Sequence, residues 1–133
     1  MITGGCRCGA VRYEADSEVA HNALCHCRDC QMAHGAPMVG WIAFKGEQVR
    51  FEGAEPVRYT GPSGSTRSFC GTCGTPVAFV NDDFLPGVVD IPSVTLDEPD
   101  AFAPRAQVQV ADRRAWMADL AKLPEFARFP GGD

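Results

Sequence analysis

Seven cysteines in a chain of 133 residues carry the strongest chemical signal in this sequence, because they fall into close groups. Spacings of one or two residues let neighbouring loops aim thiolates at one ion, about 2.3 Å from each sulfur when the ion is zinc. A disulfide framework is the weaker interpretation, since an odd number of cysteines leaves one unpaired. Simple burial of reduced thiols in the core is a further alternative. The groups are Cys6 and Cys8; Cys25, Cys27 and Cys30; and Cys70 and Cys73.

Two of these groups end in the same way, with a glycine directly after the second cysteine: Gly9 after Cys8, and Gly74 after Cys73. Glycine accepts a positive φ, so the backbone can turn there and point amide hydrogens at a thiolate. Turns of this kind commonly meet in pairs around one zinc ion. We therefore expect a structural zinc site, which in small domains is worth on the order of 10 kcal/mol of folding free energy. Its ligands would be Cys6, Cys8, Cys70 and Cys73.

The remaining cysteines, Cys25, Cys27 and Cys30, have no eighth cysteine to complete a second set of four. Three protein ligands and one open position are typical of catalytic zinc. The alternative is a closed site in which His34 or His21 supplies the fourth ligand. His26 stands between two ligands, and we expect it to point away from the ion.

An open zinc site with three thiolates has a particular chemistry. Its net charge is −1, so it is a weaker Lewis acid than a site with three neutral histidines. It remains soft and suits a further sulfur, and an incoming thiol can deprotonate there and attack an electrophile or leave as a thiolate. We therefore expect a thiol-dependent reaction.

The elements that must position these ligands are mostly short strands. Apolar, β-branched or aromatic runs of four to six residues alternate with turns, and fourteen glycines and ten prolines punctuate the chain. This pattern predicts a mainly β fold in one domain, residues 1–133. The expected strands are Ala10 to Ala15, Val19 to Leu24, Val39 to Phe44, Gln48 to Glu52, Val57 to Thr60, Thr66 to Phe69, Val77 to Val80, Gly87 to Ile91 and Gln107 to Val110.

Two short helices are expected among the strands. Arg28 to His34 precedes Gly35, which is a natural C-terminal stop. Asp112 to Leu123 has a capping aspartate, apolar residues at helical spacing and a terminating proline. We expect Trp116 to pack this second helix onto the sheet, and the aromatic side chains of the tail, Phe126 and Phe129, to hold the last residues on the surface.

Composition excludes several classes of function. The net charge of −5 argues against a nucleic-acid groove, which needs a surplus of Lys and Arg. No apolar run approaches the roughly 18 residues of a membrane span. The N-terminal residues run directly into a cysteine motif without the features of an export signal. We therefore expect a cytoplasmic protein with no nucleic-acid or membrane partner.

The order of motifs resembles a known family. GGCRCGAVRY, CHCRDCQMAHGAP, WIAF, TRSFCGTCGTPVAF and a late RRAW follow one another as in the glutathione-dependent formaldehyde-activating enzymes, which share a domain with centromere protein V. The resemblance implies an Mss4-like fold of packed antiparallel β-sheets with short helices and two zinc sites, so that the cofactors would be two Zn²⁺ per chain. It assigns the structural zinc to Cys6, Cys8, Cys70 and Cys73, and the catalytic zinc to Cys25, Cys27 and Cys30.

The same resemblance implies a carbon–sulfur lyase activity. Its partners would be a small-molecule thiol such as glutathione and a small aldehyde such as formaldehyde, which combine to S-(hydroxymethyl)glutathione. Arg67, Arg28 and Gln107 are candidate substrate contacts, and for the two arginines the alternative is a solvated side chain. Many family members carry His where this chain has Gln107, and Gln cannot act as an acid or base near neutral pH, so a proton role there is lost or moved.

Two other functions stay open at this point. One is a non-catalytic binding module with two zinc ions, and the other is a lyase or detoxifying enzyme for a different thiol or small carbonyl compound. The sequence also does not decide between a monomer and a homo-oligomer.

Overall fold

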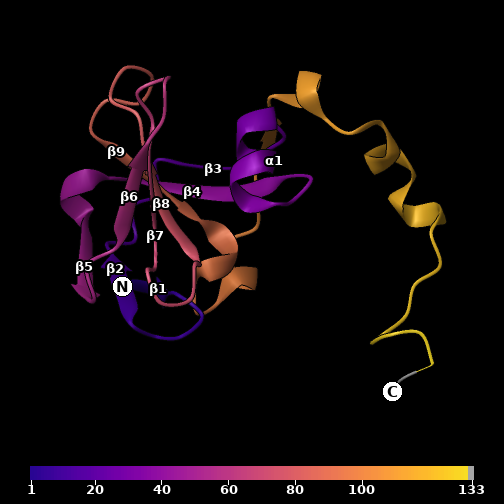
Figure 1. Cartoon of the computed structure of the whole chain (residues 1–133), viewed down its shortest axis with the longest axis horizontal. Helices are drawn as coiled ribbons and strands as arrows, with labels where there is room; N and C mark the ends of the chain where they lie inside the picture. Colours follow the sequence, from indigo (N-terminus) through magenta and orange to yellow (C-terminus); the bar gives the residue numbers. More distant parts are fainter. Residues whose placement is uncertain (132–133) are drawn as a thin grey trace.

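The computed structural model describes residues 1–131, and their fold is mainly β (Figure 1). All nine expected strands are present; β6 and β7 have the expected ends, and the ends of the others differ by one or two residues. The strands are β1 (Ile2–Gly5), β2 (Val11–Ala15), β3 (His21–Cys25), β4 (Val39–Lys45), β5 (Val49–Gly53), β6 (Val57–Thr60), β7 (Thr66–Phe69), β8 (Pro76–Val80), β9 (Val88–Pro92) and β10 (Ala106–Val108). Sequence reasoning missed β1, because two of its four residues are glycines, which have low strand propensity.

The strands form two sheets. The smaller sheet has the order β1-β2-β5, and the larger one has the order β10-β3-β4-β9-β8-β7-β6. Every pair is antiparallel except β10 with β3, which run parallel. The expectation of antiparallel sheets therefore needs one correction: β10 returns from a distant part of the chain and lies beside the strand that ends at Cys25.

The main hydrophobic core lies between the two sheets. Alternate residues of β2 point inward, as the half-buried pattern of that strand requires. Tyr13 from β2 meets Ile42 and Phe44 from β4, and Ile91 from β9 completes the contact. These four side chains are almost completely removed from solvent.

Within residues 1–131 there is one α-helix, α1, which spans Arg28–His34, as the sequence predicts. The Cys27 side chain caps its first turn, and Gly35 ends it in the left-handed conformation, with a φ of 60°. The Cys27 sulfur accepts from the Cys30 amide, and the Gly35 amide donates to the Gln31 carbonyl, so that each end of the helix has a capping hydrogen bond.

The helix expected at Asp112 to Leu123 is wrong. The structure has two 3₁₀ segments there, Val110–Asp112 and Ala115–Lys122, and the second has no buried residue. An amphipathic sequence forms a stable α-helix mainly when its apolar face is packed, and here no sheet covers it. Trp116 is 54% exposed, so it does not pack on the sheet, and the two tail aromatics, Phe126 and Phe129, are also exposed.

Figure 1 shows the consequence: the C-terminal part of the chain, coloured yellow, passes α1, leaves the folded body and extends away from it. No helix within residues 1–131 is long and apolar enough to cross a membrane.

Candidate metal centres

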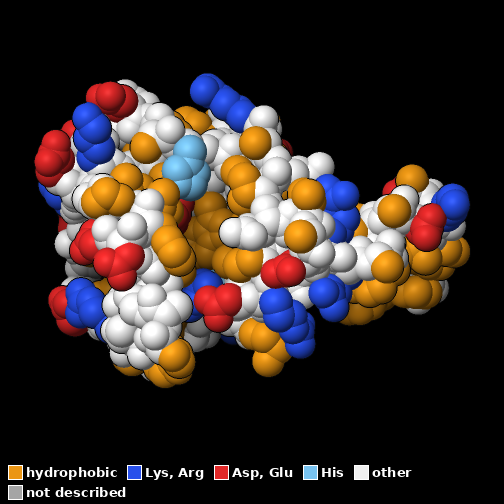
Figure 2. Space-filling view, turned by 90° about the horizontal axis from the view of Figure 1, so that it is seen from above, with side chains coloured by type: hydrophobic (Ala, Val, Ile, Leu, Met, Phe, Trp, Pro, Cys, Tyr) orange, Lys and Arg blue, Asp and Glu red, His pale blue; other side chains and the backbone are white. Residues whose placement is uncertain are grey.

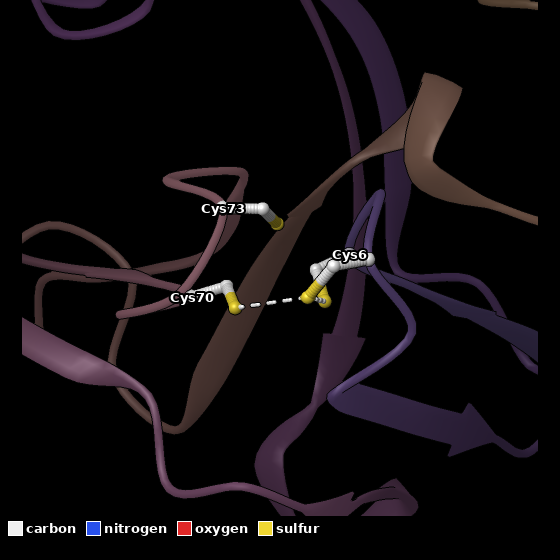
Figure 3. Close-up of side chains that lie close together, drawn as sticks. Cys6, Cys70 and Cys73 are labelled. Carbon is white, nitrogen blue, oxygen red and sulfur yellow. Dashed lines mark hydrogen bonds between the residues drawn. The ribbon is translucent and has the colours of Figure 1, made fainter.

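The four-cysteine group consists of Cys6, Cys8, Cys70 and Cys73, and its sulfur atoms all lie within 4.8 Å of one another. Figure 3 shows the labelled members, Cys6, Cys70 and Cys73, with their sulfurs turned toward a common centre. Cys8 Sγ is 3.6 Å from Cys6 Sγ and 3.7 Å from Cys70 Sγ. The first two cysteines follow β1, and the last two lie in the turn between β7 and β8. The sequence therefore paired the correct cysteines.

Both turns have the backbone that the glycines predict. Gly9 has a φ of 83° and Gly74 a φ of 78°. The amides that reach the sulfurs come from neighbouring residues: Val11 N donates to Cys6 Sγ at 3.2 Å, and Thr72 N donates to Cys70 Sγ at 3.4 Å. Such donors stabilise the anionic sulfur that a metal requires. The arrangement therefore fits a soft divalent metal such as zinc.

The pKa of the Cys73 thiol lies below that of an ordinary cysteine. The Thr75 hydroxyl lies 3.2 Å from Cys73 Sγ. Hydrogen bonding from Thr75, first from its side chain and then from its backbone, lowers the pKa of Cys73 to about 5. This thiol is therefore a ready anionic ligand.

The three-cysteine group consists of Cys25, Cys27 and Cys30, whose sulfurs also lie within 4.8 Å of one another. Cys25 ends β3, Cys27 caps α1 and Cys30 lies in the first turn of that helix. The Cys30 amide donates to Cys27 Sγ at 3.2 Å, and Cys30 Sγ is 3.8 Å from Cys25 Sγ. A strand end and a helix start thus bring three sulfurs to one point, which again fits a thiophilic metal.

No histidine or carboxylate joins this group within the described residues 1–131. His34 instead packs edge to face on Trp41, with the ring centroids 5.2 Å apart. His21 Nε2 lies 3.2 Å from Asp90 Oδ1. His26 points away, as expected, and its Nε2 is 2.8 Å from Gln107 Oε1. The three sulfurs therefore leave a fourth position of a tetrahedral ion without a ligand from these residues.

A segment around β10 supports the loop that carries the three cysteines. The His26 amide donates to the Val108 carbonyl at 3.1 Å, which extends the β10–β3 pairing into the loop. The buried Gln31 side chain donates to the carbonyls of His26 and Asp112, at 2.7 and 3.1 Å. Sequence reasoning missed Gln31, although a polar side chain on the inner face of a short helix is a usable signal for such a contact.

Asp112 has a different role from the expected one. Its carboxylate accepts a hydrogen bond from the Arg28 amide at 2.9 Å, so it caps α1 instead of a helix of its own. This contact joins residues far apart in the sequence, and it helps to hold the first turn of the helix in which Cys30 lies.

Arg67 from β7 reaches the three-cysteine group. Its Nη2 donates to Asp29 Oδ2 at 2.7 Å and to Cys30 Sγ at 3.7 Å. The guanidinium lies 4.8 Å from the Phe79 ring centroid and 6.0 Å from that of Trp41. It is thus not a freely solvated arginine: its side chain is 15% exposed, whereas that of Asp29 is 71% exposed.

The charge of Arg67 also acts on the thiols. The pKa of Cys30 falls to about 5, first because Cys25 and then Cys27 hydrogen-bond to its sulfur, and further because of Arg67. The pKa of Cys25 rises correspondingly, chiefly through the same contact with Cys30. One positive charge beside three sulfurs offsets part of the repulsion that an all-thiolate site creates.

A hollow of about 370 Å³ lies between α1 and strands β6, β7 and β8. Arg67 and Asp29 form part of its wall, and the hollow continues as far as Gly74, beside the four-cysteine group. Its remaining lining is mostly apolar and includes Met32 and Tyr59. A small polar molecule with an apolar portion is the kind of ligand that such a space accepts.

The other two substrate-contact candidates lie elsewhere. Arg28 Nη1 is 3.4 Å from Gln31 Oε1, and Gln107 Oε1 accepts from Arg113 Nη2 at 3.2 Å besides its contact with His26. Gln107 also lines a second, more open hollow of about 360 Å³ near Leu24. Neither Arg28 nor Gln107 lines the hollow beside Arg67.

Asp90 from β9 is a buried carboxyl group that sequence reasoning did not single out. Its side chain is 6% exposed and faces His21, but the Oδ1 atom has no aligned hydrogen-bond donor. Burial raises the pKa of Asp90 to about 6, an effect that nearby His21 partly opposes. It lines neither hollow, so we treat it as a structural feature.

Comparison with known proteins identifies the relationship of this chain. The sequence profile of the family described as "Glutathione-dependent formaldehyde-activating enzyme" matches residues 1–112. No curated protein shows a significant match. A crystal structure of a Rhodobacter sphaeroides protein superposes with a TM-score of 0.64 and 19% sequence identity, over 80% of this chain and 99% of that chain. At that identity, the superposition demonstrates a common fold.

Proposed function

This chain belongs to the family of the glutathione-dependent formaldehyde-activating enzyme, and from this membership we propose that it is a zinc-dependent carbon–sulfur lyase. Its reaction would form or cleave the adduct of a thiol and a small aldehyde, with glutathione and formaldehyde as the first pair to test. The two cofactor ions would be zinc, one in each cysteine group.

The observation that carries the proposal is the difference between the two cysteine groups. One offers four sulfurs, and the other offers three sulfurs without a fourth ligand from residues 1–131. When bound in the three-cysteine group, zinc would supply a soft Lewis-acidic position at which a substrate thiol loses its proton. The four-cysteine group would serve stability alone.

Arg67 is our first candidate for substrate binding. It is held in place by two aromatic rings, and its present partner, Asp29, is a largely exposed carboxylate that contacts it through one nitrogen. Asp29 can therefore turn into solvent at little cost, and a substrate carboxylate could take its place on the guanidinium. Such an exchange would hold a thiol that carries a carboxylate next to Cys30.

Arg28 and Gln107 have supporting roles in this proposal. Arg28 lies at the start of α1 and does not line the hollow, so it would support the cysteine loop through its contact with Gln31. Gln107 holds His26, the residue between the first two cysteines, and it has no acid or base function of its own. Proton transfer would therefore fall to the substrate thiol and to solvent.

The test is a comparison of exchange rates in the zinc-loaded protein. Nuclear magnetic resonance exchange spectroscopy can measure the interconversion of free glutathione and its hydroxymethyl adduct, over the uncatalysed background. We expect Cys27→Ser to abolish the acceleration, while Val94→Ser, an exposed substitution on the body, leaves it unchanged. The proposal would be overturned if the Cys27→Ser variant accelerated the exchange as much as the wild type while zinc was still bound in the three-cysteine group.

Substrate selection by Arg67 has a separate test. Asp29→Asn should lower KM for thiols with a carboxylate, because the competing internal anion is gone, and should leave KM for a neutral thiol such as 2-mercaptoethanol unchanged. Equal effects on both thiols would show that Asp29 does not compete with substrate.

A binding module without catalysis is the second candidate. It is favoured by the hydrogen bonds that hold the three-cysteine loop from several sides, since a rigid metal site can also shape a surface for a partner. Absence of thiol–aldehyde acceleration, together with two tightly held zinc ions, would favour this function. A lyase for a different thiol or carbonyl compound would show acceleration only with other substrate pairs.

We also propose a cytoplasmic location. All seven cysteines are free thiols in the structure, and two metal-thiolate sites require a compartment that keeps them reduced.

A further inference from the structure

The C-terminal arm, which we define as residues 113–131, is the part of the chain that the proposed activity does not use. It carries large apolar side chains that remain in solvent, at exposed fractions between 44% and 87%. Figure 2 shows hydrophobic side chains gathered on the lobe that stands out from the body. These side chains are Trp116, Leu120, Leu123, Phe126 and Phe129.

The arm has almost no polar attachment to its own body. Arg113 donates a hydrogen bond to Gln107. Between residues 115 and 131, the hydrogen bonds and ion pairs join arm residues only to one another. Lys122, for example, pairs with Asp119. The 3₁₀ segment Ala115–Lys122 buries no residue. A segment with this many exposed apolar groups is unfavourable alone in water and indicates a surface that covers it.

The arm also lies beyond the residues that the family profile matches, although its first four residues are the late RRAW motif. The family profile ends at residue 112. The superposition on the Rhodobacter sphaeroides protein uses 80% of this chain and covers 99% of the other. The body can therefore complete its fold without the arm, which makes the arm an addition available for contacts with another surface.

Charge indicates which surface that is. The body, residues 1–112, carries fourteen Asp and Glu against eight Lys and Arg, whereas the arm carries two against four. The body also exposes apolar side chains, among them Tyr59 on the edge strand β6 and Phe84 in the turn that contains Asp82 and Asp83. A second copy of the body thus offers both an acidic field and apolar contacts to a basic, apolar arm.

We propose that this chain forms a homodimer in which the arm of each copy docks on the body of the other. In a two-fold symmetric dimer the same contact forms twice, so that the apolar side chains of both arms are buried together. The inference is independent of the proposed reaction, because it uses no residue of either cysteine group.

The first test measures the mass of the zinc-loaded full chain by light scattering over a range of concentrations. The wild-type chain should be a dimer. The double variant Trp116→Ser/Leu120→Ser should raise the dissociation constant of the dimer at least about tenfold. Val94→Ser, which removes an equally exposed apolar group from the body, should remain dimeric. Zinc content and circular dichroism establish that each variant is folded. A monomeric wild-type chain, or a double variant as dimeric as the wild type, would overturn the proposal.

The second test distinguishes docking on a partner from docking on the same chain. Isotopically heavy and light chains are mixed, treated with a zero-length carbodiimide cross-linker and digested. Lys122 should form cross-links to body carboxylates of mixed isotopic mass, and high salt should reduce them by screening. Cross-links between Lys122 and the body of its own chain alone would refute the exchange of arms.

Discussion

Replacement of Cys70 by Ser should unfold much of this protein, whereas the same change at Cys27 should leave it folded. Cys70 is 1% exposed and belongs to a small cluster between the two sheets, in which Val11 and Val77 are the completely buried apolar partners. Burial of two valines contributes about 3–6 kcal/mol in total. A structural zinc contributes on the order of 10 kcal/mol. A bound zinc would therefore be the largest single attachment at this end of the sheets.

The expected magnitude follows from the net stability of small domains, about 5–15 kcal/mol. A lost ligand that weakens the site by even about 5 kcal/mol should lower Tm by roughly 15–25 °C, at about 3–5 °C per kcal/mol for a chain of this size. Cys27 would also hold a metal, but its group lies on one sheet and the adjoining helix, so it does not join the two sheets.

The assay is thermal unfolding by circular dichroism, with zinc content measured by elemental analysis on the same samples. Cys27→Ser should lose one zinc equivalent and only a few degrees of Tm. A Cys70→Ser protein as stable as the wild type, or a larger loss of stability in Cys27→Ser, would refute the division into a structural and a reactive site.

Three further predictions concern stability and support. Because burial raises the pKa of Asp90 to about 6, the native state keeps a proton that the unfolded chain releases, so the free energy of unfolding should fall as pH rises from about 4 to 6. Asp90→Asn should remove this fall and raise the free energy of unfolding at pH 7 by roughly 2–3 kcal/mol. Urea titrations of both proteins at each pH measure the difference, and equal pH profiles would contradict it. Gly74→Ala should cost about 1–2 kcal/mol, because alanine is strained at a φ of 78°, whereas Gly61→Ala, at a residue without positive φ, should cost less in the same melting experiment. Asp112→Ala should cost about 1 kcal/mol and weaken metal binding by the three-cysteine group alone, which a chelator competition can resolve; unchanged metal affinity would show that this cap does not support the site.

The sequence by itself determined the features that depend on local chemistry. Both cysteine groups follow from cysteine spacing, and the four-cysteine group follows also from Gly9 and Gly74, which turn the backbone after its cysteine pairs, because such a turn is built from a few neighbouring residues. The helix Arg28–His34 was predicted with its correct ends, since Cys27, which caps its first turn, and Gly35, which ends it, directly adjoin the segment. The order of these motifs was sufficient to identify the family.

The tertiary structure alone decided what depends on residues distant in the sequence. The absence of a histidine from the three-cysteine group, within residues 1–131, follows from where three histidines come to lie, and each contacts a partner from another element. Asp112 looked like the start of a helix, but it caps a different one, because a carboxylate binds whichever free amide the fold places next to it. The apolar spacing from Trp116 onward predicted a packed helix, yet periodicity specifies only which side chains need cover. Whether the same chain buries these side chains depends on where the two sheets and α1 lie. In this fold the segment Ala115–Lys122 has no buried residue.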